Sequence, residues 1–309
     1  MQNPDITPGA DMTGRDLAGM DLTRRDLGGV NFNGASLDGT LLAGANLAGA
    51  QLDGASAVDA DLSRSYLTGA RMMRADLTDA GLQGANLQRA NLDDVTAPRA
   101  LLRGAILRHG SFLRADLADA NLELADLRDS NLASARLSHA HLDGARLTGA
   151  VLRGADLTGA RLRDANLENA AMREANLENA RLRNAALDGA VCMRANLKGA
   201  DLCGVDLRGV DLQGADLTGL LYDDETQFPS RIDPDAEGAE RIGPDANLAS
   251  ADLQGVDLNG RDLSRADLRR ADLRGRTYRT QTYATRSLPG RGSGARSWTR
   301  VRSSLTAST

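Results

Sequence analysis

Hydrophobic and polar residues recur along this chain with a period of five, from Met12 to Tyr222, without a change of register. The central position i of each unit is leucine in 34 of 43 consecutive units, position i−2 is alanine in 31, and position i−1 is Asp or Asn in 22. A period of five fits neither an α-helix, which repeats every 3.6 residues, nor a plain strand, which repeats every two. The pattern therefore predicts a chain that turns a corner every five residues, with positions i and i−2 facing a narrow interior.

Central residues sort onto four faces when positions 20 apart are stacked. We number these faces first to fourth by their first central residues, which are Met12, Leu17, Leu22 and Leu27. Six of the nine central residues that are not leucine fall on the first face: Met12, Phe32, Met72, Phe112, Met172 and Cys192. The second face holds Ala57 and Ala97, and the third holds Tyr222. A square coil of four units would produce this clustering, so we expect the six side chains to form one column of the core.

The unit can be written A(D/N)LXX, and in this form it resembles the repeat of the pentapeptide-repeat family. The resemblance covers residues 10–222 and again 246–275. It implies an all-β fold, a right-handed quadrilateral parallel β-helix in which four repeats complete each coil. The first array would then contain about 11 coils and, at roughly 4.8 Å between stacked strands, form a rod about 50 Å long.

Breaks in the period divide the chain into segments. We expect an N-terminal lead-in, a long repeat array, a proline-containing cap or insertion, a short array of six repeats and a basic tail, at residues 1–9, 10–222, 223–245, 246–275 and 276–309. The tail is predicted to be disordered because it is rich in Arg, Ser, Thr and Gly. Within the long array, the unit Val95–Arg99 lacks leucine and contains proline, which predicts a weak coil or a kink.

The end of the long array needs protection, because the last coil of a β-helix exposes unpaired backbone groups that invite fibre growth. Tyr222, Phe228 and Pro229 are the residues expected to form a cap over the last leucine layer. The second array makes only one and a half coils, so we expect it to depend on the rod or on a partner chain.

Composition supports a narrow coil rather than a conventional core, because aromatic residues are only 3% of the chain. No apolar run is long enough for a membrane span, and Met1–Ala10 lacks the features of a secretory signal. The two cysteines cannot build a disulfide framework or a four-ligand zinc site. We therefore expect a cytoplasmic protein with no membrane association.

Catalytic chemistry finds little support. The three histidines, His109, His139 and His141, fall on three different faces; Cys192 is a core position and Cys203 is expected to point outward. The Asp residues at i−1 form a regular ladder, and we expect their side chains to bond nearby backbone. The glycines at i+2 serve corners rather than phosphate loops. We predict no enzymatic activity, no catalytic residue, no cofactor and no metal site.

Charge is distributed unevenly. Residues 1–222 carry a net charge of −6, residues 223–275 carry −6 and the tail carries +7. Within the long array the whole net charge lies on the second face, which includes Asp38, Asp59, Asp76, Asp79, Asp116, Asp119, Asp156, Glu178 and Asp216. This face is the candidate partner-binding surface, with a solvated face of no function as the alternative. The third face carries a basic cluster: Arg161, Arg163, Arg181 and Arg183.

Three functions remain open. The first is a non-enzymatic scaffold that presents flat faces to a protein partner. The second comes from the resemblance, because some members of the family mimic DNA, bind DNA gyrase and protect it from quinolones. Those members dimerise, so the resemblance also allows a homodimer for this chain. The third is nucleic-acid contact through the arginine-rich tail at 276–309, which could also be a solvated tail or fold back on the acidic rod.

Overall fold

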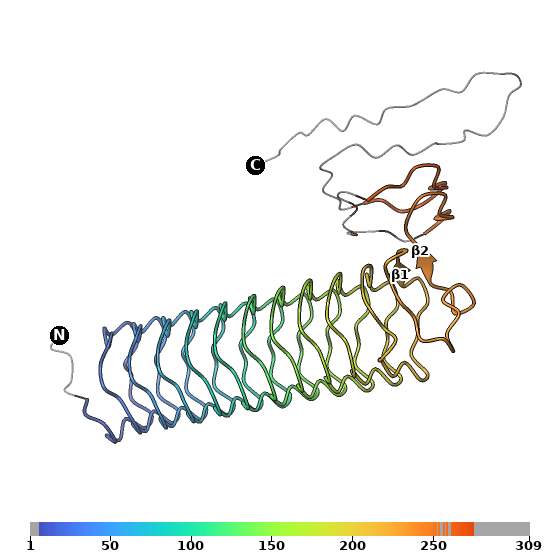
Figure 1. Cartoon of the computed structure of the whole chain (residues 1–309). Coiled ribbons are helices and arrows are strands. Elements are labelled where there is room, and N and C mark those ends of the chain that lie inside the picture. Colours follow the sequence, from blue (N-terminus) through green and yellow to red (C-terminus); the bar gives the residue numbers. More distant parts are fainter. Residues whose placement is uncertain (1–5, 252, 254–255, 257, 259–260, 275–309) are drawn as a thin grey trace, which may run out of the picture.

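The five-residue units wind around the long axis of a rod (Figure 1). The computed structural model describes residues 6–251, 253, 256, 258 and 261–274. Each unit contributes one parallel backbone bridge at position i−1, and its partner stands at the same position four units later, as for Asp11 with Asn31 and Asp16 with Ser36. Four units therefore complete one coil. The described chain is all-β, and no helix that could reach across a lipid bilayer is found in it.

Three hydrogen bonds per unit connect each coil to the next. In the unit around Leu22, the Leu22 N–H donates to the Leu41 carbonyl at 2.8 Å. The Leu41 N–H returns a bond to the Met20 carbonyl at 2.9 Å, and the Arg24 N–H donates to the Ala43 carbonyl at 2.9 Å. Positions i−1, i and i+2 thus use their N–H groups between coils. These bonds form a ladder along each face, and on the fourth face it is interrupted between the units of Leu187 and Leu207.

Corners are built from the residues after the central position. The Arg25 N–H donates to the Leu22 carbonyl at 3.2 Å, and the i+2 residue Arg24 has a φ of 57°. Glycine adopts this left-handed backbone without strain, whereas other residues pay roughly 1–2 kcal/mol. Leu124, with φ 58° and 59% exposed, is the single bulky apolar residue at such a corner in the described chain. Its side chain leans over Gly144, where a Cβ would lie 2.9 Å from Leu124 Cδ2.

Position i+1 has an N–H group that the ladder does not use. Where i−1 is Asp or Asn, its carboxylate or amide oxygen accepts from this N–H, as Asp21 Oδ1 does from Thr23 at 3.0 Å. Where i−1 is another residue, an Asp or Asn at i+1 of the preceding coil can take over: Asn33 Oδ1 accepts from the Asp53 N–H at 2.8 Å. The frequent Asp and Asn at i−1 are therefore structural acceptors.

The same geometry corrects the kink predicted at Val95–Arg99, which the structure does not contain. Pro98 occupies position i+1, so its missing N–H removes no bond from the ladder. Bridges run through this unit without interruption, from Asp76 to Thr96 and from Thr96 to Asp116. Proline is tolerated here because its position is the one whose N–H is free of backbone pairing.

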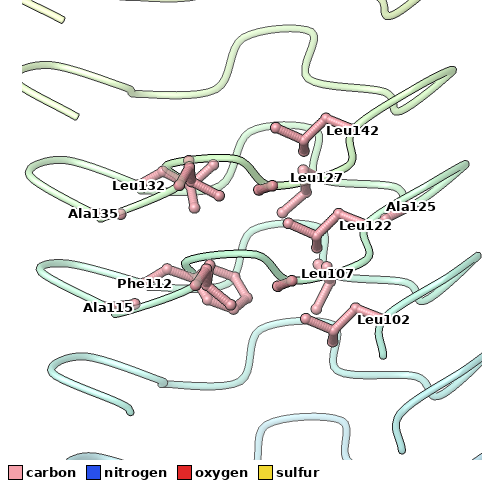
Figure 2. Packing of buried hydrophobic residues seen from close by; sticks show 14 of the residues in the cluster. Leu102, Leu107, Phe112, Ala115, Leu122, Ala125, Leu127, Leu132, Ala135 and Leu142 are labelled. Atoms are coloured by element: carbon pink, nitrogen blue, oxygen red, sulfur yellow. The ribbon is translucent and has the colours of Figure 1, made fainter. Parts of the chain in front are cut away.

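Leucine and alanine side chains fill the interior in regular layers. Figure 2 shows Leu102, Leu122 and Leu142 stacked on one face, and Phe112 beside Leu132 of the following coil on another. On the first face, the side chains of Phe32, Met72, Phe112, Met172 and Cys192 are at most 2% exposed, and Met12 packs against the core at the N-terminal end. Phenylalanine, methionine and cysteine thus replace leucine in one column without breaking the stack.

Regular pairing loosens near the C-terminal end of the rod. Strand β1 (Leu221–Tyr222) pairs in parallel with β2 (Glu240–Arg241), with Leu221 opposite Glu240. On the fourth face Asp206 pairs with Gln227, whereas no bridge joins Ala186 to Asp206 in the described part. The segment 223–245 therefore extends the ladder at two places and leaves it elsewhere.

The predicted cap residues lie together at this end. The rings of Tyr222 and Phe228 meet edge to face, with centroids 5.4 Å apart and planes at 89°. The Tyr222 hydroxyl donates to Asp235 Oδ1 at 2.5 Å, Phe228 packs against the main core, and Pro229 is buried. Burial, together with this bond to Asp235, raises the pKa of Tyr222 to about 12.

The second array has its own core and lies beside the end of the rod (Figure 1). Its bridge joins Asn247 to Asp267, which repeats the four-unit spacing of the rod. Leu221 belongs to this second core although it stands at an i−1 position of the rod, where polar residues prevail. The array thus docks on the third face of the rod, through Leu221 and Arg261.

Candidate interaction faces

The nine acidic residues predicted as a binding surface lie along one face of the rod. Successive bridges join the i−1 positions of this face from Asp16 to Asp216, so the whole second face is one continuous ladder. Five of its carboxylates accept a hydrogen bond from an i+1 N–H: Asp38 from Val58 (3.0 Å), Asp76 from Thr78 (2.9 Å), Asp116 from Ala118 (3.1 Å), Asp156 from Thr158 (3.1 Å) and Asp216 from Thr218 (3.0 Å). These five hold the corner, and only part of their charge is offered to solvent.

Ion pairs reduce the charge of the face further. Arg99 holds Asp79 with two bonds, at 2.8 and 2.5 Å, and Arg136 donates to Asp116 at 3.0 Å. The bonds from Arg99 hold the pKa of Asp79 below its usual value. Such exposed pairs contribute little to stability, but they place cations inside the acidic surface.

The carboxylates that remain gather at one corner. Asp59 and Asp119 are exposed at left-handed i+2 positions, where their N–H groups take part in the ladder, and within the described chain neither carboxylate forms a hydrogen bond or an ion pair. Both lie near Arg99, whose pKa is raised first by Asp79 and then by Asp119 and Asp59. We call Asp59, Asp79, Arg99 and Asp119 the acidic corner. Glu178 lies apart from it, with Oε2 accepting from Asn196 Nδ2 at 3.4 Å.

The third face carries the predicted basic cluster on two successive coils. A bridge joins Arg161 to Arg181, and Arg163 and Arg183 stand at i+1 of the same two units. All four side chains are half-buried. Arg161 also donates to Asp143 at 2.6 Å, so one carboxylate already balances part of the cluster. The acidic and basic surfaces therefore occupy neighbouring faces of one rod.

Cys203 was expected to point outward, and the structure corrects this prediction. Its thiol is fully buried because Arg261 of the second array covers it. Arg261 Nη2 lies 3.1 Å from both carboxylate oxygens of Asp201, and each of these side chains is 5% exposed. Arg261 Nη1 lies 3.6 Å from Asp223.

The sequence did not reveal this ion pair, because it joins residues of two arrays that differ in register. The apolar Leu221 at i−1 was no signal of cover either, because Leu41 and Leu101 occupy the same position of the same face and are exposed.

The three histidines stand on different faces, and the two cysteines are buried. His109, His139 and His141 stand on three faces, and His109 Nδ1 lies 3.8 Å from Asp129. Burial raises the pKa of the Cys192 thiol to about 12, and it raises that of Cys203 as well. A thiol held neutral in this way is a poor nucleophile. Among the residues that the structure describes, no group of three His, Cys, Asp or Glu side chains could hold a metal ion.

Comparison with known proteins identifies the repeat. The family model for pentapeptide repeats matches the chain over residues 21–56, 58–94, 99–132, 130–169, 160–191, 187–219 and 245–275. No curated protein matches the chain.

Two solved structures illustrate the likeness. HetL, a pentapeptide repeat protein involved in heterocyst differentiation regulation from the cyanobacterium Nostoc, is 30% identical over 69% of this chain and 87% of its own, with a TM-score of 0.27. A trypsin-treated variant of QnrB1, a plasmid-mediated fluoroquinolone resistance protein, is 22% identical over 69% of this chain and 92% of its own, with a TM-score of 0.39.

Proposed function

Because the chain belongs to the pentapeptide-repeat family, we propose that it is a non-catalytic scaffold that binds a protein partner through its second face. We take the rod to be a right-handed coil of square section, with about 11 coils and flat sides. We further propose that the protein acts in the cytoplasm. The acidic corner carries the proposal. Three carboxylates stand in one row with a single arginine there, and the carboxylates of two of them, Asp59 and Asp119, take no part in holding the fold.

A partner that fits this corner presents a basic surface. Complementary charge steers association and selects among partners more than it adds affinity. Five other carboxylates of the face would lose their backbone bonds if they turned toward a partner, Asp79 would lose its bonds from Arg99, and Glu178 would lose its bond from Asn196. Asp59 and Asp119 are therefore the groups free to turn.

The test is a pair of charge-removing variants in the full chain. Asp59→Asn with Asp119→Asn removes the two free charges, and both replacements keep a residue that tolerates the left-handed backbone. The matched control is Asp129→Asn, at an exposed corner of another face with φ 57°. A partner captured from cells and identified by mass spectrometry should be retained by the wild type and the control and lost by the double variant. Equal retention by all three would reject the second face as the binding surface.

The runner-up is a DNA-mimicking protein that binds DNA gyrase and protects it from quinolones. The net charge of −6 on the second face supports it, because a DNA mimic must offer a row of negative charge to a DNA-binding surface. The basic cluster on the third face and the paired carboxylates weigh against it. Supercoiling by purified gyrase, with and without a quinolone, decides the matter. No effect at micromolar protein would reject this function.

Nucleic-acid contact through residues 276–309 is the third candidate, and these residues lie outside the described part of the chain. Their seven arginines and absence of acidic residues support it. Binding to duplex DNA should then weaken steeply with salt. It should disappear when the seven arginines are replaced by glutamine. Unchanged binding in that variant would exclude the tail.

A further inference from the structure

The ladder of the rod ends on an edge that is only partly covered. On the last coil, the Leu207 N–H donates to the Gln227 carbonyl at 2.7 Å, and the Gly219 N–H donates to the Gly238 carbonyl at 2.7 Å. Between these two points the first and second faces of the coil pair with the preceding coil, as Asp211 does with Val191, but among the described residues no strand pairs with their other side. We call residues 210–217 the open edge.

The backbone groups without a partner at the open edge stand at positions that pair between coils earlier in the rod. The N–H groups of Leu212, Gly214 and Leu217 occupy positions i, i+2 and i, which donate to the next coil in most of the earlier units. The carbonyls of Val210 and Ala215 occupy position i−2, which accepts elsewhere. None of these five groups has a backbone partner in the described chain. They are spaced as the ladder requires, so they present a template for one more strand.

The chain that follows the last coil does not fill this place. Residues 229–237 leave the ladder, and Ile232 packs on the main core. A cavity of about 260 Å³ remains between this loop and the edge, lined by Leu212, Gln213, Gly214, Ala215, Leu217, Arg231, Ile232 and Glu237. A more open hollow of about 650 Å³ adjoins it beside Arg208 and Asp211. The open edge therefore has space beside it.

The charge around the edge indicates what would occupy it. Residues 206–240 contain ten acidic residues and two arginines, whereas residues 276–309 contain seven arginines and no acidic residue. Residues 277–285 include four threonines and two tyrosines, residue types that favour strands. An extended peptide that joins an exposed sheet edge gains main-chain hydrogen bonds, and the complementary charges favour this one.

The position of the second array brings that segment within reach. Arg261 is bound to Asp201, so the array is anchored at the same end of the rod as the open edge. The segment 276–309 would span about 30 Å as a flexible chain, on the order of 5–6 Å times the square root of its number of residues. Tethering also gives this segment an effective concentration far above that of a separate molecule.

We propose that residues 276–309 of this chain bind the open edge at 210–217 as an added strand. Their backbone pairs with the N–H groups of Leu212, Gly214 and Leu217, and their arginines face the acidic segment 206–240. The tail then closes the rod and removes its template for a second molecule. This role is separate from partner binding by the second face, so either proposal can fail alone.

Hydrogen exchange followed residue by residue in the full chain tests the proposal. We expect the amides of Leu212, Gly214 and Leu217 to exchange at least 100-fold more slowly than the amide of Arg153, which has no acceptor in the structure. The Leu197 amide, bonded to the Asp216 carbonyl at 2.9 Å, is the protected reference. Exchange of the three amides at the rate of Arg153 would overturn the proposal.

Two variants separate strand pairing from burial by the loop 229–237. In one, all seven tail arginines become glutamine; in the other, Thr280→Pro and Thr282→Pro remove donors from the strand. At least one variant should lose tenfold or more of the protection at the three amides and leave Leu197 unchanged. Protection kept in both variants would overturn the proposal. Protection that falls on dilution of the wild type would assign the strand to a second copy and overturn it equally.

Discussion

Proline placed at two positions of one repeat should have opposite consequences. In the unit centred on Leu152, the Val151 N–H donates to the Ser130 carbonyl at 2.9 Å, whereas the Arg153 N–H has no acceptor in the structure. Both side chains are exposed, so neither substitution disturbs the core. Val151→Pro removes a ladder bond and is expected to cost about 3 kcal/mol or more.

Arg153→Pro should leave stability within about 0.5 kcal/mol of the wild type or raise it slightly. Pro98 shows that position i+1 accepts the ring within an unbroken ladder. A compatible proline also reduces the conformational entropy of the unfolded chain, which is worth roughly 0.4–1 kcal/mol.

An intermediate case completes the series. The Ala118 N–H donates to Asp116 Oδ1 at 3.1 Å, so Ala118→Pro loses one bond to a side chain and none of the ladder. We expect a net loss of about 1 kcal/mol or less, because roughly 0.5–1.5 kcal/mol for the bond is opposed by the entropic gain. Guanidinium unfolding followed by far-ultraviolet circular dichroism measures all three variants. Equal destabilisation by Arg153→Pro and Val151→Pro would refute the division between ladder and corner amides.

Three further predictions concern the core, the docked array and acid stability. Phe112→Ala should lower the free energy of unfolding by roughly 3–5 kcal/mol in the same assay, because the ring is 1% exposed and its neighbours cannot collapse into the space. A decrease of less than about 1 kcal/mol would contradict this packing. Arg261→Ala removes the cation that balances buried Asp201, so the second array should be released from the rod. A maleimide should then label Cys203 at least tenfold faster than in the wild type, because the thiol is no longer covered. An unchanged labelling rate would show that other contacts hold the array. The bond from Arg208 lowers the folded-state pKa of Asp206 to about 2, so its contribution to stability is present above the unfolded value of 3.8 and lost as the pH falls from 3.8 toward 2. Unfolding midpoints should therefore hold steady from pH 7 to 5 and fall below pH 4, and Asp206→Asn should reduce that fall.

The period of five was sufficient to determine most of the fold. Leucine at i and alanine at i−2 can be buried together only if the chain turns at every unit, and the sorting of Phe112 and its column onto one face indicated a coil of four units. The sequence also predicted Tyr222 and Phe228 as cap residues, because the period breaks at the point where an aromatic pair can cover the last leucine layer. Local repetition carries this information because each coil contacts mainly its neighbours.

The sequence predicted only part of the candidate binding surface. Sequence sorting placed nine acidic residues on one face and predicted that those at i−1 bond nearby backbone, but it could not distinguish Asp79, which Arg99 holds, from Asp119 at the same i+2 position, whose carboxylate has no such partner in the described chain. That distinction depends on where each carboxylate oxygen points and on whether an arginine of the next coil reaches it. Likewise, Pro98 was predicted to weaken or kink the coil, because the sequence does not show which N–H group of a unit makes no backbone bond between coils.

Short-range repetition and long-range contact thus determine different parts of this molecule. The sequence alone determined the coil, its interior and the distribution of charge among faces, because these follow from spacing within a single coil. Tertiary structure alone decided that Arg261 pairs with Asp201, that Cys203 is buried and that the N–H groups of Leu212, Gly214 and Leu217 find no backbone acceptor among the described residues. These features depend on how the chain departs from its period after Tyr222. Once the register is lost, spacing no longer predicts which residues meet.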